Sequence, residues 1–135
     1  MATEEVRCVL LADRHPGLAE GVRGLLETTF DAVVMVADEI SLFESARWLH
    51  VPLAVVELSL SRGNALGMIR RIRDRFPELK LIVLSSHAEK NVQRAVIAAG
   101  ANGFVLKRSI ATDLLPAVDA VLAGNLYPAF PTASS

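Results

Sequence analysis

The side chains of this chain that could take part in chemistry directly follow short apolar runs. In chain order they are Asp13, Arg14, His15, Glu57, Ser85, His87 and Lys107. If the apolar runs are strands of one open α/β sheet, ligands bind beyond the carboxyl ends of those strands. We therefore expect these side chains to converge on one site.

Two kinds of chemistry at such a site are disfavoured by the sequence. No G-x-G-x-x-G motif follows the first apolar run, and no G-x-x-x-x-G-K-[ST] motif occurs anywhere, so binding of a dinucleotide or of a nucleoside triphosphate is not indicated. His15 and His87 could be imagined as a metal pair, but no third ligand stands at a recognisable spacing from them.

The elements that must position these residues alternate regularly along the chain. Short runs rich in Val, Ile and Leu predict buried strands over residues 6–12, 32–37, 53–58, 79–84 and 103–106. Between and after them, apolar residues recur at helical spacing and predict five helices. Five β/α units in strict alternation predict an open, doubly wound parallel sheet of five strands.

The ends of the predicted helices carry residues typical of caps. They are Ser41 and Asn64 at the starts of the second and third helices, and Gly100 and Gly124 at the ends of the fourth and fifth. Pro116 lies within the fifth helical pattern. If Asp113 is the N-cap of that helix, Pro116 falls in its first turn, where a missing N–H costs little.

Composition bounds the class of protein. The chain has 135 residues, with 14 Lys and Arg against 15 Asp and Glu, which suits one soluble domain without the basic excess of a nucleic-acid binder. No apolar run approaches the roughly 20 residues that span a bilayer, and the acidic start is unlike a signal peptide. We expect a cytoplasmic protein with no membrane contact, folded over residues 1–124, with a tail or the start of a linker over residues 125–135.

Four segments together resemble the receiver domain of two-component response regulators, and more narrowly its NarL/FixJ (LuxR-type) branch. They are VLLADRHP, VVELSLSRGNALGMIRRIR, LIVLSSH and AGANGFVLKRS. The resemblance covers about residues 6–124 and implies a flavodoxin-like (βα)5 fold with strand order 2-1-3-4-5. It also implies that the chain is not an enzyme in its own right.

In such domains, acidic residues after the first strand and an Asp after the third bind Mg²⁺, and that third-strand Asp accepts a phosphoryl group from a histidine kinase. The resemblance assigns Asp13 to the first acid, Ser85 and Lys107 to phosphoryl contacts, and Phe104 to the switch aromatic. Two positions depart from the pattern. Glu57 stands at the acceptor position and Arg14 at the second acid.

These two departures change the charge of the expected site. Three carboxylates and one lysine give a net charge of about −2, which suits Mg²⁺, whereas Asp13, Arg14, Glu57 and Lys107 sum to zero. We therefore expect Mg²⁺ binding at Asp13 to be weak or lost, and no cofactor. Glu57 extends one methylene further than Asp, so we expect it to stand in for a phosphorylated Asp and to pair with Lys107 or Arg14.

Simpler readings of each residue stay open. Glu57 could be a solvated carboxylate at a strand end, and Arg14 a surface loop residue. Ser85 could be a turn hydroxyl and Lys107 a surface lysine. Phe104 could be plain core packing, since it lacks a hydroxyl.

The leading hypothesis is a degenerate, phosphorylation-independent receiver domain in bacterial signalling or transcription control. We expect self-association through residues 89–124, from Glu89 to Gly124, or contact there with an output domain or a histidine kinase. The NarL/FixJ branch carries a helix-turn-helix output domain after a linker, and Leu126-Tyr127-Pro128 resembles the start of such a linker. The 135 residues contain no helix-turn-helix domain. We expect DNA to be bound only through such a domain. The alternatives are a working phosphoacceptor, in which Glu57 accepts the group and Asp13 holds a metal, and a small-molecule sensor.

Overall fold

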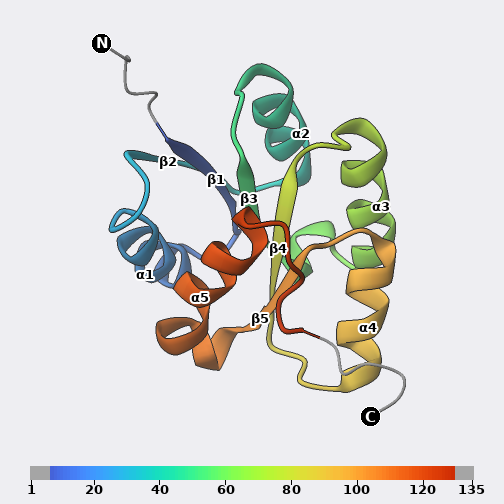
Figure 1. Ribbon diagram of the computed structural model, residues 1–135. Coiled ribbons are helices and arrows are strands. Elements are labelled where there is room, and N and C mark those ends of the chain that lie inside the picture. The colour runs from blue at the N-terminus through green and yellow to red at the C-terminus, as the bar shows by residue number, and fades with distance from the viewer. Residues whose placement is uncertain (1–6, 130–135) are drawn as a thin grey trace.

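Five parallel strands form one sheet in the order β2-β1-β3-β4-β5, with helices on both faces (Figure 1). The computed structural model describes residues 7–129. The strands are β1 (Cys8–Ala12), β2 (Ala32–Val36), β3 (Leu53–Glu57), β4 (Lys80–Ser85) and β5 (Gly103–Leu106). The helices are α1 (Pro16–Leu26), α2 (Glu39–Trp48), α3 (Ala65–Arg75), α4 (Lys90–Ala99) and α5 (Ile110–Leu122), with short 3₁₀ helices η1 (Leu58–Ser61) and η2 (Lys107–Ser109). The predicted fold class and strand order are confirmed.

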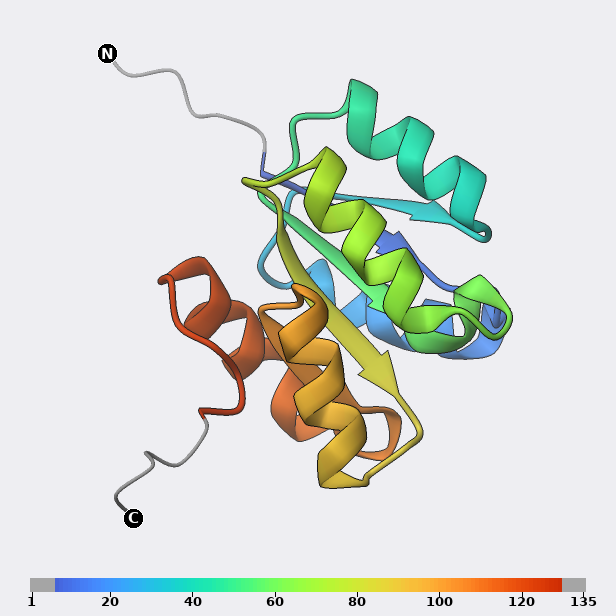
Figure 2. The same ribbon diagram turned by 90° about the vertical axis from the view of Figure 1, so that its right-hand side faces the viewer.

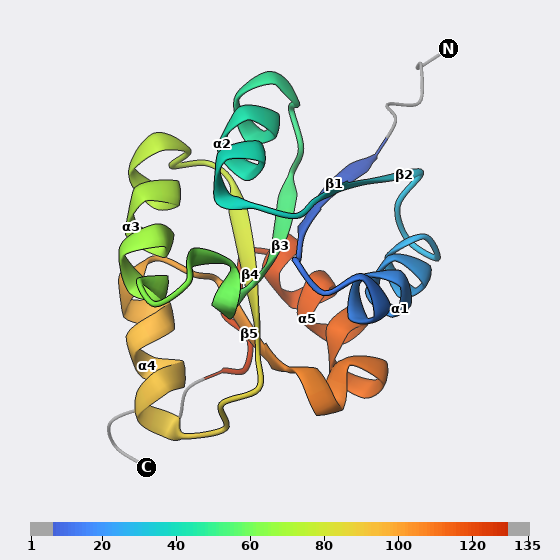
Figure 3. The same cartoon turned by 180° about the vertical axis from the view of Figure 1, so that it is seen from behind.

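Two cores lie on opposite faces of the sheet. Helices α1 and α5 cover one face and α2, α3 and α4 cover the other, as the view from behind shows (Figure 3). Neighbouring residues of one strand serve different cores: Leu11 packs under α1 and α5, and Leu10 packs on the other side. Because both faces are buried, the strands need no polar alternation, which explains their continuous apolar runs.

Strand β5 has the predicted bounds, and the other four strands differ from the predicted ranges by one or two residues. Strand β1 begins at Cys8, whereas the predicted run began at Val6, which lies outside the described residues. Strand β3 ends at Glu57 because Leu58 already starts η1. The arrowheads of β2, β3 and β4 point to the same side of the molecule (Figure 2), so the polar residues that follow the strands gather at one edge.

Helix α2 begins earlier than its sequence predicted. The N-cap is Asp38, whose carboxylate accepts a hydrogen bond of 2.7 Å from the backbone N–H of Ser41. The prediction of Ser41 as the cap is therefore wrong: Ser41 lies in the first turn and provides the N–H that is capped. This hydrogen bond lowers the pKa of Asp38. Two other predicted caps are confirmed, since Asn64 is the N-cap of α3 and Gly100 is the C-cap of α4. The C-cap of α5 is Ala123, one residue before the predicted Gly124.

Helix α5 also begins earlier than predicted, and the placement of Pro116 changes with it. The N-cap is Ser109 and not Asp113, so Pro116 lies in the second turn of the helix and not in the first. The early start is explained by packing, because Ile110 and Leu114 are buried against the sheet. Pro116 is exposed, so water can satisfy the carbonyl that loses its intrahelical partner.

The end of the sheet opposite the polar residues is held by Arg73 of α3. Its guanidinium donates to the carbonyls of Gly100 and Leu79 and to the side-chain oxygen of Asn102, over 2.7 to 3.0 Å. These bonds join the end of α3 to the starts of β4 and β5. Burial lowers the pKa of Arg73. Gly100 has a φ of +128°, and a β-carbon there would lie 2.9 Å from the β-carbon of Arg73, so only glycine fits this approach.

The segment after α5 runs back along the free edge of β5. The backbone of Tyr127 accepts from Phe104 N–H over 2.7 Å and donates to the carbonyl of Asn102 over 3.0 Å. The first residues of the predicted tail are thus attached to the sheet, while residues 130–135 lie outside the described part of the chain. Among residues 7–129, no helix has the length and apolar character needed to cross a membrane.

Candidate functional site

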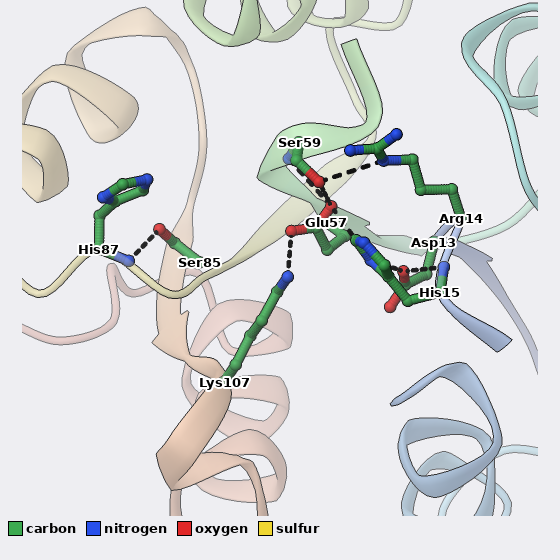
Figure 4. Close-up of polar contacts among 8 residues, drawn as sticks. All are labelled: Asp13, Arg14, His15, Glu57, Ser59, Ser85, His87 and Lys107. Carbon is green, nitrogen blue, oxygen red and sulfur yellow. Dashed lines mark hydrogen bonds and ion pairs between the residues drawn. The ribbon is translucent and has the colours of Figure 1, made fainter. Parts of the chain in front are cut away.

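Glu57 is a buried carboxylate at the carboxyl end of the central strand β3. Its residue surface is 2% exposed, so the reading of Glu57 as a solvated carboxylate is wrong. One side-chain oxygen, Oε1, forms an ion pair with Nζ of Lys107 (Figure 4). The other, Oε2, accepts from the backbone N–H of Ser59 over 2.9 Å and from the Ser59 hydroxyl. Every polar atom of this side chain therefore has a partner.

These contacts follow from where the elements end. Lys107 begins η2 directly after β5, and Ser59 lies in η1 directly after β3, with Glu57 as the N-cap of η1. A buried charge is costly unless it is paired and hydrogen-bonded, and both conditions are met here. The Lys107 side chain is 22% exposed, so it reaches inward from the rim and is not a free surface lysine.

Asp13 is the second buried carboxylate at this edge and follows β1. Its Oδ1 accepts from the backbone N–H of His15 over 2.8 Å and lies 3.2 Å from Nδ1 of the same histidine. Its Oδ2 is buried and has no hydrogen-bond partner among the described residues. A buried carboxylate oxygen without a partner is unfavourable, and it marks a place where a water, a proton or a cation is needed.

Arg14 lies at the rim of the site. It is exposed, and its Nε donates to the Ser59 hydroxyl oxygen over 3.4 Å (Figure 4). Ser59 in turn donates to Glu57, so Arg14 is linked to the carboxylate through one hydroxyl. Lys107 and Arg14 were the two partners expected for Glu57. Lys107 contacts Glu57 directly, whereas Arg14 reaches it only through Ser59.

Ser85 and Phe104 occupy buried positions beside the pair. Ser85 ends β4, is fully buried, and accepts from the backbone N–H of His87 over 2.9 Å, so in this structure it acts as a turn hydroxyl. Phe104 is 4% exposed and belongs to the core under α2, α3 and α4. A pocket of about 410 Å³ connects the site to solvent and is lined by Glu57, Ser85, Lys107 and two of the three histidines, His15 and His87.

The sequence did not reveal the cluster that His15 forms. Asp13, His15 and Glu57 each offer one ligand atom, and these atoms all lie within 4.8 Å of one another. The Asp-x-His spacing after β1 could have indicated two members of this cluster, Asp13 and His15. The third member, Glu57, comes from another strand, β3. His87 points away from this cluster, with Nδ1 3.9 Å from Glu89 (Figure 4).

The strand order and the charged pocket beyond the strand ends define a flavodoxin-like α/β domain of the receiver type. The sequence model of the response regulator receiver domain matches residues 9–119, and the chain belongs to this family. It is a receiver domain of bacterial two-component response regulators, and its relatives are regulators of the LuxR/NarL type. Proteins of this family are generally not enzymes.

Two curated relatives illustrate the match. The transcriptional activator protein ExaE of Pseudomonas putida is 32% identical over 93% of this chain and 60% of its own length. The transcriptional regulatory protein RcsB of Escherichia coli K12 is 29% identical over 88% of this chain and 57% of its own length. The chain thus spans less than two thirds of these regulators.

Among solved structures, the isolated receiver domain of RcsB from Salmonella enterica serovar Typhimurium matches in two forms. In the presence of the phosphomimetic BeF₃⁻ the TM-score is 0.80, with 27% identity and coverage of 91% of this chain and 93% of that one. In the apo form the TM-score is also 0.80, with 30% identity and coverage of 90% and 91%. The fold is therefore shared with both forms.

The receiver family implies Mg²⁺ at this site, but the donor atoms present fit that ion poorly. Mg²⁺ requires near-octahedral oxygen ligands. Both Glu57 oxygens are engaged, by Lys107 and by the two donors of Ser59. The unpartnered buried oxygen is Oδ2 of Asp13, and the third member of the local group of possible ligands, His15, offers a nitrogen and not an oxygen. The position that the resemblance assigns to the second acid holds the cationic Arg14.

Proposed function

We propose that this chain is a receiver domain whose state is set by the Glu57–Lys107 ion pair and not by phosphoryl transfer. The observation that carries the proposal is the occupancy of Glu57: Lys107 holds Oε1, and Ser59 holds Oε2 with two donors. A carboxylate must present a free lone pair to accept a phosphoryl group. Here the acceptor position is buried and its oxygens are committed.

The pair supports a partial mimic of a phosphorylated receiver. In the family the fifth-strand lysine contacts phosphoryl oxygens, and here Lys107 contacts a Glu57 oxygen instead. A phosphoryl group brings about −1.5 to −2 charge and three oxygens, whereas Glu57 brings one charge and two oxygens. Lys107 is therefore engaged by a weaker anion, and Ser85 keeps its bond to the backbone N–H of His87.

We further propose that the domain acts through protein contacts at residues 89–124. Exposed Lys90 and Arg94 give α4 a basic surface, and exposed Asp119 gives α5 an acidic residue. Helices α4 and α5 flank β5 on opposite faces of the sheet, and opposite charges on the two helices favour an isologous pairing of two copies. An output domain or a histidine kinase would use the same surface, and DNA would be contacted only through an output domain.

The alternative is a working phosphoacceptor, and one observation favours it. Asp13 Oδ2 is buried without a partner among residues 7–129, which is what a cation ligand would look like without its ion. In that case Glu57 would leave Lys107 and Ser59, bind the cation together with Asp13, and accept the phosphoryl group.

An amide NMR titration with Mg²⁺ and then beryllofluoride separates the two. We expect no saturable shifts at Asp13, Glu57, Ser85 and Lys107 at millimolar Mg²⁺. The Arg14→Asp, Glu57→Asp double variant, which restores both acids, is the positive control and should respond. Saturable wild-type shifts at these residues, or incorporation of one phosphoryl group from a small phosphodonor, would refute the proposal.

Self-association is tested separately by light scattering during size-exclusion chromatography. We expect wild-type protein to form dimers whose population falls in the Arg94→Glu variant, with Arg47→Glu on the distant helix α2 as the control. A monomer at all concentrations, or equal loss in both variants, would refute the dimer surface without bearing on Glu57.

A further inference from the structure

A second hollow of the molecule lies between α3 and α4, which run side by side on one face of the sheet (Figure 3). This groove has a volume of about 490 Å³, within the range of roughly 300–1,000 Å³ that small-molecule sites occupy. It adjoins the pocket over Glu57, with which it shares Leu58 and His87, but Glu57 and Lys107 do not line it. The groove is therefore a separate place for a ligand.

One part of the groove is an apolar wall. Leu66 comes from α3, and Val92, Ala95 and Val96 come from the first turns of α4. Val96 is fully buried, and Leu66 and Val92 are half-buried against the same core. A ligand with an apolar body would remove the remaining exposed surface of these side chains from water, which favours its binding.

The starts of both helices form the other part of the groove. Asn64 is the N-cap of α3 and Glu89 the N-cap of α4, and neither side chain accepts a hydrogen bond from its helix. The first-turn N–H groups of both helices therefore lack a capping side chain, and each helix start carries a partial positive charge. The side chains of Asn91 and His87 also line the groove and can donate hydrogen bonds.

The charges around the groove favour an anion as the ligand. Among the described residues, no carboxylate lines the groove. Arg62 and Lys90, both exposed, directly precede lining residues at its two sides. The acid beside it is Glu89, which is itself exposed, with one oxygen 3.9 Å from Nδ1 of His87. Two cations against one exposed acid give this rim a net positive charge.

We propose that the groove between α3 and α4 binds a small organic anion with an apolar body, such as an aromatic carboxylate or sulfonate. The body lies against Leu66, Val92 and Ala95, and the anionic group lies at the starts of the two helices, beside Asn91. This inference does not depend on the proposed function, because the groove lies outside the Glu57–Lys107 ion pair.

Two fluorescent probes test the groove on the whole chain. Anilinonaphthalene sulfonate combines an apolar body with an anion, and phenylnaphthylamine has a similar body without charge. We expect one equivalent of the sulfonate to bind with a saturable rise in fluorescence, and the neutral probe to bind at least about three-fold more weakly. Amide NMR shifts caused by the sulfonate should fall at Leu66, Val92 and Ala95.

Three variants locate the site and its preference for an anion. Ala95→Trp fills the groove and should weaken binding of both probes at least about ten-fold. Ala98→Trp places the same side chain at an exposed position of α4 and, as the matched control, should keep both affinities within about two-fold. Asn91→Asp puts a carboxylate into the groove at a helix start that tolerates it. It should weaken the sulfonate about ten-fold and leave the neutral probe within about two-fold.

Absence of sulfonate binding would overturn the proposal, as would equal effects of Ala95→Trp and Ala98→Trp or equal affinity for the two probes. Shifts that fall instead at Ile40 and Phe43, in the hollow between α2 and α3, would also overturn it. If Ala95→Trp does not fold by circular dichroism, the two probes on Asn91→Asp still decide. Neither Mg²⁺ nor a phosphodonor is used, so failure here leaves the test of phosphoryl transfer untouched.

Discussion

Removing the cation from the central ion pair is the sharpest test of how this site is stabilised. Lys107→Met keeps the length and apolar stem of the side chain but leaves Glu57, 2% exposed, with only the two donors of Ser59. Breaking a fully buried pair costs about 3–5 kcal/mol, and an exposed pair about 0–1 kcal/mol. Because Lys107 is 22% exposed, we expect a loss of about 2–3 kcal/mol in the free energy of unfolding.

Urea unfolding followed by circular dichroism measures this loss, and the melting temperature should fall by roughly 6–10 °C. Arg108→Met is the matched control, because Arg108 is the exposed neighbour and should change stability by less than about 0.5 kcal/mol. Adding Glu57→Gln to Lys107→Met removes the unpaired charge and should recover at least about 1 kcal/mol. If Lys107→Met is as stable as Arg108→Met, the pair does not stabilise the fold and the reasoning fails.

Three further predictions concern the frame around the site. Gly100→Ala should destabilise the protein by about 1–3 kcal/mol because of the φ of +128° and the contact of the new β-carbon with Arg73. Gly21→Ala, with open space around the new β-carbon, should stabilise the protein by about 0.5–1 kcal/mol. The melting temperatures of both variants test this pair of predictions. Arg73→Lys should destabilise by about 2–3 kcal/mol in urea, since lysine cannot reproduce the forked contacts to Gly100, Leu79 and Asn102. The lowered pKa of Asp38 contributes stability that is present above its unfolded value of about 3.9 and is lost as pH falls through the folded value. The free energy of unfolding, measured from pH 6 to pH 2, should therefore fall less in Asp38→Ala than in the wild type. An equal fall in both proteins would contradict the role of Asp38 as the cap.

The sequence was sufficient to predict where the site lies, because strand ends are marked by a change from apolar to polar residues. Glu57 and Asp13 follow unbroken apolar runs, and parallel strands bring their carboxyl ends to one edge. The sequence could not determine which cation pairs with Glu57. Lys107 and Arg14 both lie next to strand ends, and the choice depends on side-chain directions that only the assembled sheet fixes.

Local helix starts were less predictable for a related reason. Ser41 and Asp113 are both good capping residues by type, but the helices begin earlier, at Glu39 and Ile110. In α5 the burial of Ile110 and Leu114 extends the helix toward its N-terminus, so tertiary packing outweighs the preference of a single residue. The contact of His15 with Glu57 was hidden for the same reason, since its partners come from two strands.

The two residues that the resemblance marks as departures, Glu57 and Arg14, are connected in the structure through Ser59. Glu57 is long enough to contact Lys107 with one oxygen and Ser59 with the other. Arg14, at the position of the second acid, binds the Ser59 hydroxyl that donates to Glu57. An acid at position 14 would instead place a third negative charge beside Asp13 and Glu57 and would disfavour the buried pair unless a cation were bound. Replacing Arg14 alone by an acid should therefore weaken the Glu57–Lys107 ion pair as long as no divalent cation is bound.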